Sequence, residues 1–236
     1  MAIYEYKTRI RYSEINSNGI LSEAALLDLF QNCSIFQSEA IGLGIEHLKS
    51  ENRAWVLTSW QIIIDKMPRF NEEVTIQTWS YGIKFTLGFR NFRMLSSEGE
   101  VLAYANTIWA YIDTNTLMPV RCPAEVSEIY GIEPPIEMEV ANRKITLPED
   151  MQEQNDFEVA NYFIDTNNHM NNAKYVLLAQ QYLPSDVTIR EIRAEYKKSA
   201  MLHDIVHTST HYSDNILTVA MTDDEGNTYA TVQFIY

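Results

Sequence analysis

Three polar side chains suited to hydrolytic chemistry stand at alternate positions in the second half of the chain: Asp165, Asn167 and His169. A helix is predicted to begin soon after them, and the first N–H groups of a helix lack intrahelical partners and attract negative charge. A carboxylate or an imidazole can take a proton from water, and a helix start can hold the oxyanion that forms. Because a thiol with a pKa of about 8.5 leaves readily, these groups suffice to hydrolyse a thioester without a covalent nucleophile. The same residue types also favour turns and N-caps, so the spacing alone leaves a purely structural loop as an equal alternative.

Other residues that could bind a metal or act as nucleophiles have less favourable spacing. His203, His207 and His211 lie four residues apart in a region whose pattern predicts a strand, and such residues are separated by about 13 Å. Bonds from a protein to a metal are only about 2 Å long, so we expect no shared ion and predict that no metal or nucleotide cofactor is required. Cys33 and Cys122 form neither a CxxC pair nor a metal-ligand pattern, which favours a reducing cytoplasm and leaves a disulfide between them as an alternative that no feature of the sequence requires.

The composition is that of a globular protein with a strong negative charge. Among 236 residues, 18 are basic and 32 acidic, which gives a net charge of −14, and 46% are hydrophobic. This charge repels phosphate backbones, so we expect no nucleic acid partner. No apolar run approaches the ~20 residues that span a bilayer, and the first residues do not resemble a targeting segment. We therefore expect no membrane insertion and a cytoplasmic location.

Hydrophobic periodicity predicts a strand, a long helix and then four strands in the first half of the chain. Apolar residues recur at helical spacing after an N-cap at Ser22 until Gly42 and Gly44 end the pattern. The other segments alternate or are rich in β-branched and aromatic residues, as strands are. These strands are predicted at residues 4–12, 55–67, 74–84, 85–95 and 101–112. The order favours an α+β layout in which a sheet wraps around a helix.

The same order of elements begins again in the second half. An acidic stretch with several prolines, residues 131–155, is interpreted as a linker between an N-terminal domain, 1–130, and a C-terminal domain, 156–236. A second helix is predicted between the polar motif and Pro184. Four strands follow it, at residues 187–198, 205–212, 216–222 and 228–235. Aligning Glu14 with Asp165, Asn16 with Asn167 and Asn18 with His169 relates the two copies, so we interpret the chain as a duplicated module.

The polar motif resembles the D-x-N-x-H-V-N-N-x-K-Y motif of acyl-acyl carrier protein (ACP) thioesterases, the plant plastid enzymes and their bacterial relatives. It has Met170 in place of Val and otherwise matches at Asp165, Asn167, His169, Asn171, Asn172, Lys174 and Tyr175. Segments of the first half resemble the same family in order, at residues 55–56, 68–79, 99–101 and 105–109. The resemblance therefore covers nearly the whole chain.

This resemblance implies a tandem hotdog fold, in which each half is an antiparallel sheet wrapped around one long helix. It implies an acyl-chain pocket in the first half and catalytic residues in the second. Asp165, Asn167 and His169 match the family's catalytic Asp, Asn and His.

The chain departs from a second family motif, E-Y-R-R-E-C, which reads EYKKSA at residues 195–200. Ser199 replaces an acid and Ala200 replaces a thiol, which argues against a cysteine nucleophile. We therefore predict that Asp165 or His169 activates water and that Asn167 orients the water or the carbonyl group. His169 is also an alternative acid for the departing thiol. Ser199 is expected to act only through hydrogen bonds, because a hydroxyl needs its own activator to serve as a base.

The activity that the resemblance implies is hydrolysis of fatty acyl-ACP to free fatty acid and holo-ACP. The alternatives are hydrolysis of acyl-coenzyme A, a hotdog hydratase or dehydratase, and a non-catalytic acyl-binding protein. An ACP is acidic, so two acidic proteins need a local basic patch to associate, and Arg193 and Lys197, on one face of a predicted strand, are the favoured positions. The duplicated module already supplies the pairing that a single hotdog obtains from a partner, and a homodimer stays an open alternative.

Overall fold

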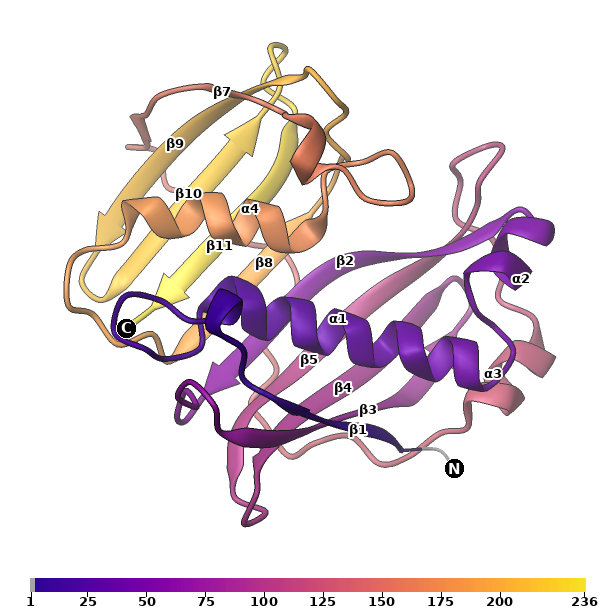
Figure 1. Cartoon of the computed structure of the whole chain (residues 1–236). Coiled ribbons are helices and arrows are strands. Elements are labelled where there is room, and N and C mark those ends of the chain that lie inside the picture. Colours follow the sequence, from indigo (N-terminus) through magenta and orange to yellow (C-terminus); the bar gives the residue numbers. More distant parts are fainter. Residues whose placement is uncertain (1–2) are drawn as a thin grey trace. The chain divides into compact units, whose positions relative to one another are not determined.

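The computed structural model describes residues 3–236 and divides into two compact units. The N-terminal unit comprises the chain up to Thr58 together with Ile62–Val140, and the C-terminal unit comprises Ser59–Gln61 and Ala141–Tyr236. Within each unit a helix lies across one face of a twisted sheet (Figure 1). This arrangement confirms the predicted α+β hotdog layout. Among the described residues, no helix is both long enough and apolar enough to cross a membrane.

The sheet of the N-terminal unit has the strand order β1-β3-β4-β5-β2. Pairing is antiparallel from β1 to β3, from β3 to β4 and from β4 to β5. The strands are β1 (Tyr4–Arg9), β2 (Arg53–Ile64), β3 (Glu73–Lys84), β4 (Leu87–Ser96) and β5 (Val101–Asp113). The helical segments are η1 (Tyr12–Glu14), α1 (Glu23–Ala40), α2 (Ile45–Ser50) and α3 (Ala124–Tyr130). The strands predicted from periodicity are all present.

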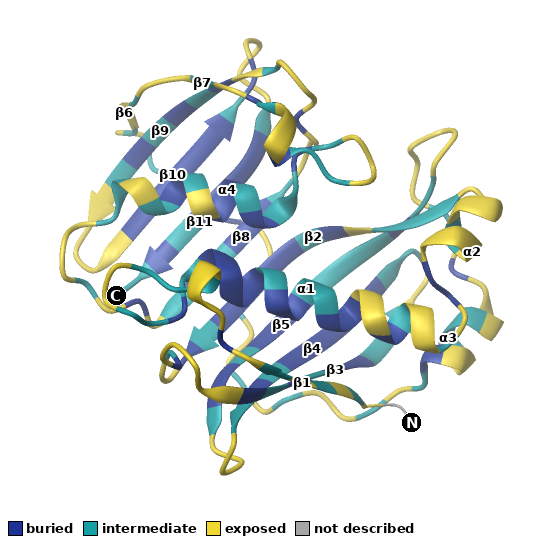
Figure 2. Cartoon of the chain, viewed as in Figure 1, coloured by how far each residue is buried: buried dark blue, intermediate teal, exposed yellow. Residues whose placement is uncertain are grey.

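Helix α1 begins and ends where its local sequence requires. The Ser22 hydroxyl caps the helix by accepting a hydrogen bond from the Ala25 N–H at 3.3 Å. Gly42 follows the last turn with φ of +77°, a backbone conformation that costs glycine little. The side of α1 that faces the sheet is buried (Figure 2), and its Phe30 ring stacks on Phe92 of β4 with centroids 5.3 Å apart. Burying each such side chain contributes about 1.5–3 kcal/mol, so packing on the sheet stabilises this helix.

The sheet of the C-terminal unit has the order β8-β11-β10-β9-β6, and β7 also pairs with β9. The strands are β6 (Gln152–Glu153), β7 (Phe157–Glu158), β8 (Glu191–Tyr196), β9 (Ile205–Ser213), β10 (Ile216–Thr222) and β11 (Thr228–Ile235). Every strand pairing recorded in this sheet is antiparallel. The helical segments are η2 (Asn161–Phe163), α4 (Asn172–Ala179) and η3 (Gln180–Tyr182). The short strands β6 and β7 lie in or just after the stretch that the sequence suggested was a linker.

Helix α4 is shorter than the long helix that the resemblance implied. It has eight residues, compared with 18 in α1, and continues only as the 3-10 turn η3. Leu183 is already extended, with φ of −65° and ψ of 139°. Pro184 explains this change, because proline disfavours helical geometry in the residue before it. Tyr182 extended the apolar helical pattern beyond the helix itself.

Three histidines on or beside β9 bind different carboxylates. The pairs are His203 with Glu158 at 2.6 Å, His207 with Asp156 at 3.0 Å and Asp224 at 2.8 Å, and His211 with Asp150 at 2.9 Å. Most of these carboxylates come from residues 150–158, which run along the edge of β9. Within the described part of the chain, no three potential ligands are grouped closely enough to hold a metal. The histidines instead attach this segment to the edge of the sheet.

The pairing of His207 predicts a pH-dependent contribution to stability. Its hydrogen bonds to Asp224 and Asp156 raise the pKa of His207. Because the pKa of His207 is higher in the folded state than in the unfolded state, protonated His207 stabilises the fold. This stabilisation is fully present below the pKa of His207 in the unfolded chain, about 6.5, and is lost as pH rises through its pKa in the folded protein. We expect the loss of unfolding free energy caused by His207→Gln to be largest near pH 6 and to shrink as pH rises. Denaturant unfolding across this range measures it, with His47→Gln as the control. A difference that grows with pH would contradict this assignment.

Candidate active site

The polar motif forms a tight loop between η2 and α4. This loop, residues 164–170, is here called the motif loop. A β-bridge between Ile164 and Met170 closes it, and the Asp165 N–H donates to the His169 carbonyl at 2.8 Å. One carboxylate oxygen of Asp165 accepts a hydrogen bond from the Asn167 N–H at 2.7 Å. Asp165 therefore has a structural role as an Asx turn, as the local interpretation of the sequence allowed. The loop also holds three of the four predicted site residues, Asp165, Asn167 and His169, on one short segment, and only Ser199 lies outside it.

Residues 15–21, here called the N-terminal loop, lie just before α1 and form a loop of the same construction. The Asn16 N–H donates to the Ile20 carbonyl at 2.8 Å, and the Asn16 side chain accepts from the Asn18 N–H at 3.0 Å. Asn16 thus corresponds to Asp165, Asn18 to Asn167 and Ile20 to His169. The predicted alignment, which placed Glu14 with Asp165, is wrong by two residues, because it matched acid with acid rather than the Asx turns.

The two loops also share their unusual backbone conformation but differ in chemistry. Gly19 has φ of +73° in the N-terminal loop, and Asn168 has φ of +61° at the corresponding place. Asparagine is one of the few residues besides glycine that adopt this conformation readily. The position of the imidazole is occupied by an aliphatic side chain in the N-terminal loop. Groups capable of proton transfer are therefore present only in the motif loop.

The side chains of the motif loop are accessible and largely unengaged. Asp165 and His169 are half-buried, and Asn167 is exposed. Asp165 and His169 form no ion pair with each other within 4 Å. In the part of the chain that the structure describes, neither the His169 ring nor the Asn167 carboxamide makes a hydrogen bond. These groups are free to contact a ligand.

The start of α4 offers fewer free amides than the sequence suggested. The Asn171 side chain caps the helix by accepting from the Ala173 N–H at 2.8 Å, and its own N–H donates to the Phe163 carbonyl. The Lys174 N–H donates back to the Asn171 carbonyl at 2.9 Å. The Asn172 N–H, by contrast, has no hydrogen bond to any described residue. It is the amide at this helix start that can donate to a negatively charged oxygen.

The substituted strand motif ends beside the motif loop. The Ala200 carbonyl accepts a hydrogen bond from the Met170 N–H at 2.9 Å, which joins the segment after β8 to the loop. Ser199, the residue before it, is exposed, and its hydroxyl has no hydrogen bond to the described residues. The structure thus brings the backbone next to Ser199 to the site without tying its side chain to Asp165 or His169.

Two tyrosines to which the sequence analysis assigned no role support the site. The Tyr175 hydroxyl oxygen accepts from the Ala200 N–H at 3.0 Å, and the Tyr196 hydroxyl donates to the Asn172 carbonyl at 3.0 Å. Burial raises the pKa of Tyr175 to about 12, so its phenol stays neutral at physiological pH. Tyr175 is the last residue of the motif, but its helical spacing indicated only a core position. Its contact with Ala200 joins segments distant in sequence and leaves no local signal.

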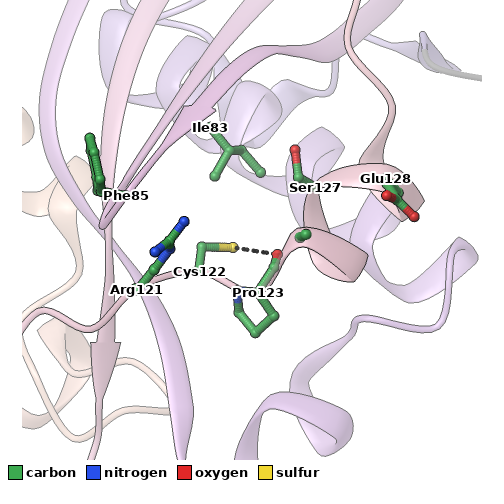
Figure 3. A pocket seen from close by; sticks show the side chains of 8 residues that line it. Ile83, Phe85, Arg121, Cys122, Pro123, Ser127 and Glu128 are labelled. Carbon is green, nitrogen blue, oxygen red and sulfur yellow. Dashed lines mark hydrogen bonds between the residues drawn. The ribbon is translucent and has the colours of Figure 1, made fainter.

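The two cysteines lie in the N-terminal unit and are both buried, free thiols. Burial raises the pKa of Cys33 to about 12 and that of Cys122 to about 11. Both thiols are therefore protonated near neutral pH and are poor nucleophiles. Cys122 faces a cavity of about 320 Å³ in this unit (Figure 3). The cavity is lined by Ile83, Phe85, Arg121, Cys122, Pro123, Ala124, Ser127 and Glu128, and by none of the motif residues.

Two family models match the chain in succession. The acyl-ACP thioesterase N-terminal domain matches residues 2–130, and the acyl-ACP thioesterase C-terminal domain matches residues 147–236. Among curated relatives, a chloroplastic palmitoyl-acyl carrier protein thioesterase of Gossypium hirsutum is 24% identical over 90% of this chain and 56% of its own length. The chain thus spans about half the length of the curated relatives it matches.

Solved structures confirm the fold over the full chain. A crystal structure of an acyl-ACP thioesterase from Bacteroides thetaiotaomicron has a TM-score of 0.89 at 24% identity, covering 99% of this chain and 97% of that one. A 12:0-ACP thioesterase from Umbellularia californica has a TM-score of 0.87 at 16% identity, covering 99% and 93%. Both similarities extend through the N-terminal and the C-terminal unit.

Proposed function

The chain belongs to the acyl-ACP thioesterase family, and on that premise we propose that it hydrolyses fatty acyl-ACP to a free fatty acid and holo-ACP. The observation that carries the proposal is the contrast between the two loops. They share a backbone hydrogen-bond pattern, but Asp165 and His169 stand where the N-terminal loop has Asn16 and Ile20. A loop kept only for its shape would not need a carboxylate and an imidazole at these places.

The proposed reaction is attack of water on the thioester carbonyl. His169 takes the proton from the attacking water as the C–O bond forms, because imidazole exchanges protons readily near neutral pH. The Asn172 N–H holds the oxyanion, and Asn167 orients the water. When the C–S bond breaks, His169 returns the proton to the departing thiolate. The negative charge of Asp165 stabilises the imidazolium that exists between these two steps.

We assign the acyl chain to the N-terminal unit and carrier recognition to the face of β8 that bears Arg193. The Arg193 guanidinium donates to the Gln233 side chain at 3.0 Å and to the Asn142 carbonyl at 2.6 Å, both neutral acceptors. Its charge is thus available in a protein with a net charge of −14. By contrast, Arg9 and Arg11 are paired with nearby glutamates. Glu191 and Glu195 share this face of β8, but Arg193 forms no ion pair with a described residue, and an acidic carrier is attracted by such an unpaired cation.

The test is release of thiol from matched acyl-ACP and acyl-coenzyme A substrates with chains from about C8 to C18, since pocket shape sets chain-length preference. We expect faster release from acyl-ACP. Faster release from acyl-coenzyme A would contradict the assigned carrier and support the alternative thioesterase. No release from either would contradict hydrolysis, and assays for hydration of enoyl thioesters and for acyl binding would then separate the remaining alternatives.

A reaction without a cysteine nucleophile predicts that both thiols are dispensable. We expect Cys33→Ala and Cys122→Ala to retain kcat within about twofold of the parent, because both thiols are buried in the N-terminal unit and protonated near neutral pH. The measurement is steady-state hydrolysis by each variant, together with treatment of the parent enzyme by a thiol-alkylating reagent. Loss of kcat in a folded variant would show that a thiol takes part in the reaction.

A further inference from the structure

Tyr175, on the buried face of α4, connects this helix to the segment that holds the motif loop. We propose that Tyr175 is a positioning residue for hydrolysis, whose phenol oxygen fixes Ala200 and thereby the backbone that presents His169. The inference rests on the proposed function and deepens it. Tyr175 does not touch the reacting atoms in this assignment, so its effect passes through the loop.

The hydrogen bonds around Tyr175 form a closed circuit. The motif loop leads directly into α4, which carries Tyr175 in its first turn. The Tyr175 oxygen accepts from the Ala200 N–H at 3.0 Å, and the Ala200 carbonyl accepts from the Met170 N–H at 2.9 Å. Met170 is the neighbour of His169 in the chain. Displacement of any member of this circuit therefore displaces the loop.

The N-terminal unit has the same frame without this circuit. The Leu21 N–H donates to the Pro68 carbonyl at 2.9 Å, in the place of the bond from Met170 to Ala200. Proline has no N–H to satisfy. The position in α1 that corresponds to Tyr175, four residues after the N-cap, is Leu26, which has no hydroxyl. The N-terminal unit therefore lacks both the phenol and the N–H of this contact. It is also the unit whose loop lacks the ionisable groups that Asp165 and His169 supply.

The correspondence between Pro68 and Ala200 rests on the turns that follow them. The Arg69 N–H donates to the Glu72 carboxylate at 3.1 Å, and the Met201 N–H donates to the Asp204 carboxylate at 2.9 Å. Asn71 and His203, at the same place in each turn, both have φ of 71°. The two turns are therefore equivalent, and the Tyr175 contact is an addition to the shared frame rather than a part of it.

Burial makes this contact sensitive to removal of a single oxygen. Tyr175 is 1% exposed and Ala200 is fully buried, so water cannot replace the phenol as an acceptor. Without that acceptor, the Ala200 amide is left unsatisfied unless the segment moves. Movement of the segment carries Met170 and the loop with it. Because misplacement of a reacting group by about 1 Å can cost up to about 10²-fold in rate, a small shift is enough to affect hydrolysis.

The test is Tyr175→Phe, with kcat and KM for acyl-ACP and hydrogen exchange of the Ala200 amide measured on the full chain. We expect kcat to fall about tenfold, KM to stay within about twofold, and the amide to exchange faster. The matched control is Thr210→Val, since Thr210 is fully buried and its hydroxyl accepts from the Gln154 side chain rather than from a member of the circuit. We expect the control to lower the unfolding midpoint at least as much and to keep kcat within about twofold.

A double variant, Tyr175→Leu with Ala200→Pro, distinguishes two roles of Tyr175: positioning the motif loop, and merely accepting a hydrogen bond from the buried Ala200 N–H. It installs the pair found in the N-terminal unit, so no N–H is left unsatisfied. We expect its unfolding midpoint to return toward the parent while kcat stays low. Recovery of kcat with stability would overturn the positioning role, as would an unchanged kcat in Tyr175→Phe. A parent enzyme without hydrolytic activity would instead overturn the proposed function, and this inference with it.

Discussion

Replacement of His169 by alanine is expected to lower kcat for acyl-ACP hydrolysis by about 10²- to 10⁴-fold, the usual contribution of a positioned general base. The imidazole is the group assigned to take the proton of the attacking water. Its ring makes no hydrogen bond to the described residues, so its removal leaves the frame of the loop in place. The backbone bond from the Asp165 N–H to the His169 carbonyl does not depend on the side chain. The loss should therefore appear in kcat, with an unfolding midpoint close to that of the parent.

The matched control for this variant is Ile20→Ala in the N-terminal loop. Ile20 holds the place of His169 in a loop with the same backbone hydrogen bonds. We expect Ile20→Ala to keep kcat within about twofold, whatever it costs in stability. Steady-state hydrolysis of one acyl-ACP at saturating concentration compares the two variants. Activity of His169→Ala within a few-fold of the parent would remove the imidazole from the reaction.

Elements defined by local pattern could be predicted from the sequence alone. Strands β10 and β11 were predicted with the bounds that they have, because segments rich in apolar and β-branched residues and the acidic, Gly-containing turn between them are local signals. The N-cap at Ser22 was also predicted correctly, since it depends on residues within one helical turn. The end of α4 was not, because Tyr182, which follows it, continues the helical spacing although Pro184 prevents the helix itself.

Features that depend on pairing between distant segments could not be predicted in the same way. The attachment of residues 150–158 to β9 rests on bonds across about fifty positions, and no local period indicates it. The contact between Tyr175 and Ala200 is of the same kind. Within the site, the motif identified Asp165 and His169, but sequence comparison aligned them with the wrong residues of the first half. Backbone hydrogen bonds corrected that alignment, because they report the shape of a loop independently of its side chains.

Asp165 combines a structural role with a proposed electrostatic one, and two substitutions separate them. Asp165→Asn keeps an oxygen that can accept from the Asn167 N–H, while it removes the charge. The N-terminal loop shows that asparagine supports this turn, since the Asn16 oxygen accepts from the Asn18 N–H at 3.0 Å. Asp165→Ala removes both the acceptor and the charge. The asparagine variant should therefore fold like the parent, and any decrease in its kcat results from removal of the negative charge.

We expect Asp165→Asn to lower kcat by about 10²-fold, because a carboxylate about 6–8 Å from an imidazolium, beyond ion-pair distance, stabilises it by about 2–3 kcal/mol at an effective dielectric constant of about 20. Asp165→Ala should lose at least a further tenfold, since the turn that positions Asn167 and His169 is lost as well. The measurement is kcat for both variants beside their unfolding midpoints. If Asp165→Asn matched the parent while Asp165→Ala was impaired, the carboxylate would serve only the turn. If instead Asp165→Asn reduced the rate further than His169→Ala did, the proton of the water would pass to Asp165, and His169 would take the role of the acid.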